Sequence, residues 1–253
     1  VAVTTLTTQP GTIAGNTTAC EGSSQIYSIA VISSATSYTW SLPSGWTGSS
    51  TSISIVTTSG SSSGNVSVTA NNSCGASTPR TLSVTINPLP TQPGTITGNT
   101  SICEGSSQTY SITSVSGATS YTWTLPSGWT GSSTSTSITT TAGASSGTIS
   151  VMANNSCGSS TPRTLSATVT PLLAQPGIMT GSATVCQNSS QTYSVASITG
   201  ATSYTWSLPS GWASSSTTNS ITAIIGSTGG TLSITANNSC STSTPRTLSV
   251  AVE

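Results

Sequence analysis

The stretch SYTWSLPSGW occupies residues 37–46, and near-identical copies occupy 120–129 and 203–212. The cysteines and the arginine of each copy keep the same 83-residue step (Cys20 to Cys103 is 103 − 20 = 83), and no insertion interrupts it. A fixed period of this kind indicates tandem repeats. We therefore predict three repeats of one domain after a short segment that is a preceding end strand or a linker: 1–7, then 8–88, 89–171 and 172–253.

Alternating side chains predict strands throughout each repeat. In SYTWTLP (120–126), Tyr121, Trp123 and Leu125 fall on one face and the threonines on the other. Six or seven such stretches per repeat, separated by Gly, Ser, Asn and Pro and without helical spacing, predict an all-β chain of three antiparallel β-sandwiches. We expect the tyrosine and the first tryptophan of the motif to lie in the core: Tyr38, Trp40, Tyr121, Trp123, Tyr204 and Trp206.

The second tryptophan of the motif follows the turn PSGW and has two interpretations. It is either a lid over the end of the core or an exposed aromatic platform on which sugar rings stack. The residues concerned are Trp46, Trp129 and Trp212.

The composition excludes most chemistry. Charged residues make up 2% of the chain, histidine is absent, and three arginines balance three glutamates. Nucleic acids and anionic membrane surfaces need basic clusters that are missing here, and no apolar run is long enough to span a bilayer. Without His or Asp there is no catalytic triad, and Glu21 and Glu104 lie in different repeats. We expect no catalytic residue, no metal and no cofactor.

Each repeat has two cysteines 54 residues apart (74 − 20 = 54). Their even number and the absence of His favour disulfides over a metal site. We predict one disulfide within each repeat, clamping one end of the sandwich: Cys20–Cys74, Cys103–Cys157 and Cys186–Cys240. Charged residues beside these cysteines suggest weak exposed ion pairs, Glu21 with Arg80 and Glu104 with Arg163.

The motif YTW-x-LPSGW, with CEGSSQTY upstream and ANNSCG-x-STPRTLSV downstream, resembles the PKD-like domains of bacterial surface proteins. The resemblance implies an immunoglobulin-like sandwich that serves as a spacer, stalk or adhesive module without catalysis. Such domains occur in tandem in adhesins and surface proteins of gliding and biofilm-forming bacteria, many of them exported by type IX secretion. The acidic turn of better-known members, WDFGDG, is replaced here by WTLPSGW, so calcium binding of the related kind is not expected.

Together these observations predict a non-catalytic segment of an extracellular filament or long surface adhesin. Its proline-rich linkers, INPLPTQPG (86–94) and VTPLLAQPG (169–177), favour extended connections and a stiff stalk. The expected partners are further repeats or copies of the same polymer. The alternative is an array that binds polysaccharide through the second tryptophans. The opening VAV (1–3) matches the end of a repeat, as in a window cut from a longer array or a donated strand.

Overall fold

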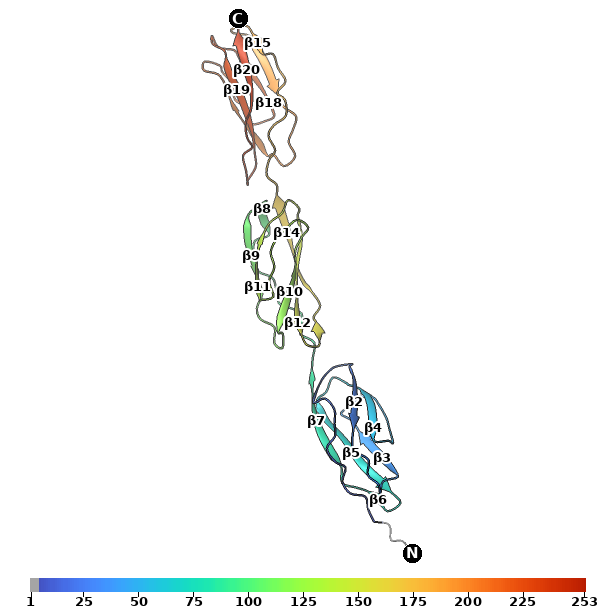
Figure 1. Cartoon of the computed structure of the whole chain (residues 1–253). Coiled ribbons are helices and arrows are strands. Elements are labelled where there is room, and N and C mark those ends of the chain that lie inside the picture. The colour runs from blue at the N-terminus through green and yellow to red at the C-terminus, as the bar shows by residue number, and fades with distance from the viewer. Residues whose placement is uncertain (1–4) are drawn as a thin grey trace. The chain divides into compact units, whose positions relative to one another are not determined.

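The computed structural model describes residues 5–253, and all its regular elements are β-strands (Figure 1). Repeat 1 contains β1 (Thr18–Cys20), β2 (Ser24–Ser28), β3 (Ser37–Ser41), β4 (Ser54–Thr58), β5 (Gly64–Asn72), β6 (Gly75–Ala76) and β7 (Arg80–Asn87). Repeat 2 contains β8 (Ser101–Cys103), β9 (Ser107–Ser111), β10 (Ser120–Thr124), β11 (Ser137–Thr141), β12 (Gly147–Asn155), β13 (Gly158–Ser159) and β14 (Arg163–Thr170). Repeat 3 contains β15 (Thr184–Val185), β16 (Ser190–Ser194), β17 (Ser203–Ser207), β18 (Ser220–Ile224), β19 (Gly230–Asn237) and β20 (Arg246–Val252).

Every repeat has one larger sheet and one two-stranded sheet. In repeat 1 the strand order is β1-β7-β5-β3, with β6 beside β5, and β2 pairs with β4. The corresponding larger sheets are β8-β14-β12-β10, with β13 beside β12, and β15-β20-β19-β17. All pairings are antiparallel except that of the short first strand, which runs parallel to the last strand. The predicted all-β class with three tandem sandwiches is confirmed.

The core follows from alternation along the strands. In β5, with the sequence GNVSVTANN, the side chains of Val66, Val68 and Ala70 are buried, and the residues between them face outward or are only half-buried. They pack with Tyr27 of β2, which has no exposed surface, and with Ile55 of β4. β-Branched residues at alternate positions suit a pleated strand with one buried face. This pattern explains why a chain rich in Ser and Thr still builds a core.

A buried tyrosine lies at the centre of each sandwich: Tyr27, Tyr110 and Tyr193. Each hydroxyl donates a hydrogen bond to a backbone carbonyl, that of Asn16 (3.2 Å), Asn99 (2.9 Å) or Ser182 (3.1 Å). Burial raises the pKa of all three hydroxyls above the ordinary value of 10.0, because the phenolate loses its hydration.

These tyrosines make the fold sensitive to alkali. A raised pKa in the folded state means that the full stability is present below the ordinary pKa of 10.0 and is lost as the pH rises through the folded value. We expect the free energy of unfolding to be flat from neutral pH to about 9 and to fall above about 10. Urea unfolding of thiol-alkylated protein across this range measures it. Tyr27→Phe should reduce the loss of stability above pH 10. If the pH dependence of the Tyr27→Phe protein equals that of the unaltered protein, the alkali sensitivity does not come from Tyr27.

The chain divides into two compact units, and repeat 2 contributes to both. One unit contains the chain up to Gly94 with 114–122 and 152–162, and the other contains 95–113, 123–151 and 163–253. The end strand expected at residues 1–3 lies outside the described residues. Thr5 to Thr7 form no strand.

Candidate functional site: the cystine joints

The motif tyrosines are buried in all three repeats. The hydroxyl of Tyr38 accepts a hydrogen bond from the backbone N–H of Ile32 at 2.9 Å, and Tyr121 and Tyr204 accept equivalent bonds at 2.8 Å. The first tryptophans are only half-buried: Trp40, Trp123 and Trp206. Trp40 and Trp206 pack against the core cluster of their own repeat. These tryptophans, expected in the core, therefore lie at its margin, where they are only partly buried.

The second tryptophans are buried, which contradicts the platform interpretation. Trp46, Trp129 and Trp212 expose only 7–8% of their surface. Each indole N–H donates to a backbone carbonyl at 2.9–3.0 Å. Each ring lies 6.2–6.4 Å, between centroids, from the buried tyrosine of its repeat. Because the faces of these rings are covered by the protein, they cannot stack on a sugar.

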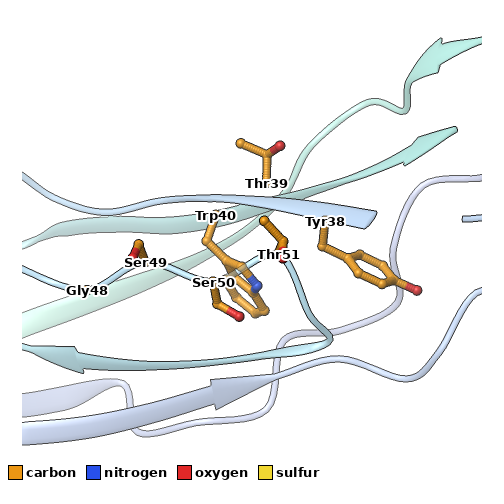
Figure 2. A pocket seen from close by; sticks show the side chains of 7 residues that line it. All are labelled: Tyr38, Thr39, Trp40, Gly48, Ser49, Ser50 and Thr51. Carbon is orange, nitrogen blue, oxygen red and sulfur yellow. The ribbon is translucent and has the colours of Figure 1, made fainter. Parts of the chain in front are cut away.

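A pocket of about 450 Å³ lies beside β3 in repeat 1 (Figure 2). Figure 2 shows Tyr38 and Trp40 on one side of the strand and Thr39 on the other. The remaining lining is uncharged, from Gly48 to Thr51. The indole N–H of Trp40 already donates to the carbonyl of Ser52 at 3.0 Å. The hydroxyl groups that line the pocket can hydrogen-bond a neutral ligand, but the lining contains no acidic or basic side chain of the kind that catalysis uses.

The two cysteines of repeat 1 lie at opposite ends of its larger sheet. Cys20 ends β1 and pairs in register with Asn87, the last residue of β7. Cys74 lies in the hairpin between β5 and β6, where Asn71 pairs with Ala76. This hairpin comes just before Arg80, the first residue of β7, so Cys74 lies near the beginning of β7. Eight residues of β7 at about 3.3 Å each separate the two ends by more than 20 Å. A disulfide needs Cα atoms within about 7 Å.

The disulfides therefore join neighbouring repeats. Cys20 of repeat 1 bonds to Cys157 of repeat 2, and Cys103 of repeat 2 bonds to Cys240 of repeat 3, both with a Cα–Cα distance of 5.4 Å. One bond lies in each compact unit. The predicted pairings within repeats, Cys20–Cys74, Cys103–Cys157 and Cys186–Cys240, are wrong. The cause is the parallel first strand, which carries the first cysteine to the end of the sandwich where the last strand leaves.

Hydrogen bonds accompany each cystine. In the first joint, the side chain of Asn155 accepts the N–H of Cys157 at 2.8 Å and donates to the carbonyl of Pro88, in the linker, at 2.8 Å. In the second joint, Asn238 makes the same two bonds to Cys240 and Pro171, both at 2.9 Å. The asparagine therefore fixes the cysteine turn and the incoming linker together. We define a joint as one cystine with this Asn hairpin and its linker.

The second joint has an additional contact. The carboxylate of Glu104, next to Cys103, accepts the N–H of Leu172 in the linker at 2.9 Å. Arg163 is the first residue of β14. Thr170, the last residue of β14, pairs with Cys103, and Glu104 follows Cys103 in the sequence. Arg163 and Glu104 therefore lie at opposite ends of this strand. Glu21 and Arg80 are separated in the same way in repeat 1, and the Nε–H of Arg80 donates to the carbonyl of Pro10 at 3.0 Å. The predicted ion pairs are wrong for the same reason as the cystines.

The described residues hold no cluster of three or more His, Cys, Asp or Glu that could bind a metal ion. Among the same residues, no helix is long and apolar enough to cross a membrane. The chemistry that the joints show is covalent crosslinking. Cysteine pairs of this kind form and persist in oxidising compartments.

A family model described as "PKD-like domain" matches residues 6–84, 89–167 and 172–250. The chain belongs to the PKD-like domain family. The three matches keep the 83-residue step and cover nearly the whole chain, and PKD-like repeats are typically non-catalytic structural modules. The repeat boundaries proposed from the sequence differ from the matched ranges by a few residues and stay a prediction. No curated protein matches the sequence significantly.

Solved structures with a similar fold include a cell adhesion molecule and an adhesin. The N-terminal eight Ig domains of Down syndrome cell adhesion molecule align over 96% of this chain with 14% identity and a TM-score of 0.47. This chain spans 37% of that structure. The Escherichia coli adhesin FdeC aligns over 96% of both chains with 14% identity and a TM-score of 0.41. Extracellular domains 3–5 of Drosophila OTK align over 94% of this chain and 95% of their own, with 12% identity and a TM-score of 0.36. At such values these structures carry no argument about function.

Proposed function

We propose that these PKD-like repeats form a non-catalytic stalk segment of an extracellular bacterial filament or surface adhesin. The observation that carries the proposal is the pair of cystines between successive repeats, Cys20–Cys157 and Cys103–Cys240. Each joint has two covalent connections, the peptide linker and the cystine. A domain held at two points cannot swivel freely about its linker. Tension along the chain is shared by both connections, which suits a stalk.

The composition supports this role. With three arginines and no lysine, the chain offers trypsin-like proteases few cleavage sites. A cut within a linker would leave the two repeats joined through the cystine. With three arginines and no lysine, the chain offers no basic cluster for nucleic acid or for anionic lipid. Disulfides form and persist in oxidising compartments, which supports a location outside the cytoplasm.

Pulling the chain by its ends in a single-molecule force experiment tests whether the cystines carry tension. With both bonds intact, the shortest covalent path from Cys20 to Cys240 in the unfolded chain crosses the first cystine to Cys157, follows the backbone to Cys103 and crosses the second cystine. Only the 54 residues between Cys103 and Cys157 are then stretched, which is about 190 Å when extended. After reduction it runs through 220 residues (240 − 20), about 770 Å. We expect complete unfolding to gain about 580 Å on adding a reductant. An extension that does not change on reduction would overturn the proposal.

A double variant makes the test specific. With Cys103→Ser and Cys240→Ser, the remaining Cys20–Cys157 bond leaves the 83 residues from 157 to 240 (240 − 157) in the path. Pairing within repeats would leave 166 residues (240 − 74) instead, because Cys20–Cys74 would be the bond in the path. The measured contour length therefore separates the two arrangements, about 290 Å against about 580 Å.

A further inference from the structure

We propose that the pocket beside β3 in repeat 1 binds a neutral saccharide, with Trp40 as the surface against which a sugar ring packs. The ligand is a chain of uncharged sugar units. The inference goes beyond the stalk role, because that role rests on the cystines and the saccharide site rests on the pocket.

Trp40 offers a fixed and partly open aromatic surface. Its side chain packs against the core cluster of repeat 1 but is only half-buried, whereas Trp46 exposes only 7% of its surface. The indole N–H of Trp40 donates to the carbonyl of Ser52 at 3.0 Å, and this bond holds the ring in one orientation. The ring therefore meets a ligand in the pocket through its carbon atoms. A side chain that is held in place before binding loses little conformational entropy when the ligand arrives.

The segment 48–51 supplies the polar part of the lining (Figure 2). The hydroxyl of Ser50 donates to the carbonyl of Ser54 at 2.6 Å, and this bond ties the segment to the first residue of β4. Ser49 and Thr51 are exposed. Their hydroxyls can each donate and accept a hydrogen bond, as the hydroxyls of a sugar do.

The chemistry of the lining selects the ligand. The volume of about 450 Å³ lies within the range of small-molecule sites, about 300–1,000 Å³. None of the lining side chains is charged, so a charged ligand would lose hydration without gaining an opposite charge. A purely apolar ligand would cover the serine and threonine hydroxyls without replacing their hydrogen bonds to water. A sugar ring has an apolar C–H face for the tryptophan and hydroxyls around its edge, so it matches both parts of the lining.

Repeats 2 and 3 carry the same set of residues. In repeat 2 all the lining positions are identical, and in repeat 3 only Gly48 is replaced, by Ser214. The indole N–H groups of Trp123 and Trp206 donate to backbone carbonyls 12 residues further on, at 3.0 and 2.9 Å, as that of Trp40 does. One chain therefore presents three equivalent positions to a saccharide.

Nuclear magnetic resonance of the whole isotope-labelled chain tests the site directly. The six tryptophans give one indole N–H signal each. Titration with soluble oligosaccharides of glucose, mannose or N-acetylglucosamine should shift the signals of Trp40, Trp123 and Trp206. The signals of the buried tryptophans are internal controls and should not move: Trp46, Trp129 and Trp212.

Negatively charged oligogalacturonate is the control ligand and should shift none of these signals. The inference is overturned if no neutral oligosaccharide moves the signals of the three half-buried tryptophans. It is also overturned if only oligogalacturonate moves them.

Filling the pocket without removing the tryptophan separates binding from folding. Thr51 is exposed, and so are its equivalents Thr134 and Thr217, so substitution there should leave the urea midpoint nearly unchanged. The triple variant Thr51→Glu, Thr134→Glu and Thr217→Glu puts a longer, charged side chain at each pocket. Its affinity for the oligosaccharide that shifts the signals should fall about tenfold or more, as measured by isothermal titration calorimetry.

A second triple variant adds the same charges on the opposite face of the larger sheet. Thr81 pairs in register with Ser67, and Ser67 pairs with Ser41, so Thr81 lies on the face away from Trp40. The control carries three substitutions: Thr81→Glu, Thr164→Glu and Thr247→Glu. Its affinity should equal that of the unaltered chain. Equal losses in both triple variants would show that added charge, and not the pocket, governs binding, and would overturn the inference. A chain that binds no saccharide but keeps both cystines loses this inference alone, and the proposed stalk role stands.

Discussion

Trypsin should leave the fragments 1–80, 81–163 and 164–246 joined as one species when the protein is denatured and alkylated without reduction. The chain has three arginines and no lysine, so trypsin can cut only after Arg80, Arg163 and Arg246. The Cys20–Cys157 bond ties the first fragment to the second, and Cys103–Cys240 ties the second to the third. The mass of the unreduced digest measures this directly.

The same digest after reduction is the control, and it should release all three fragments. Disulfides within repeats would place both partners in one fragment each: Cys20 with Cys74, Cys103 with Cys157, and Cys186 with Cys240. Three separate masses without reductant would therefore refute the joints. The result is all-or-none, because the cleavage sites fall between the repeats' cysteines.

Trp212→Ala should unfold repeat 3 rather than remove a binding surface. Trp212 is buried against Tyr193, and its N–H is bonded to the carbonyl of Thr228. Removing a buried tryptophan costs about 3–5 kcal/mol, through the lost burial and the cavity left behind. That is a large fraction of the stability of a small domain. Urea unfolding followed by circular dichroism measures the loss.

Trp206→Ala is the matched control within the same repeat. Trp206 is half-buried at the edge of the core, so its loss should cost clearly less than that of Trp212. Equal losses, or a Trp212→Ala protein with unchanged stability and altered polysaccharide binding, would restore the platform interpretation.

The repeat, the strands and the buried tyrosines could be predicted from the sequence because alternation and periodicity are local signals. The motif tyrosines fall on the apolar side of their strand, and the structure buries them. The burial of Trp212 could not be decided in this way, since it follows a turn whose direction depends on the opposite sheet. The first tryptophan of each motif falls on the same face of its strand as the buried tyrosine, as alternation predicts. Alternation does not show how much of the tryptophan the neighbouring strands cover.

The cystine pairing could not be predicted from local pattern. Spacing alone made the shorter loop, from Cys20 to Cys74, the natural choice. The deciding fact is the parallel pairing of β1 with β7, which places Cys20 beside Asn87. The pairing partner of a strand depends on the fold of the whole repeat. It cannot be read from the three residues of β1 alone. The NNSC stretches have the composition of turns, but the hydrogen bonds from their asparagines to the linker appear only in the fold.

The pairing also sets an order of events during maturation. In an unfolded chain the 54-residue loop between Cys20 and Cys74 closes about four times more readily than the 137-residue loop of the native bond. Once repeat 1 has folded, the length of β7 keeps these two thiols apart. Folding before oxidation therefore favours the native bonds, each of which needs the following repeat as its partner. An export route that keeps thiols reduced until the repeats fold would yield correct chains, whereas early oxidation would trap scrambled ones.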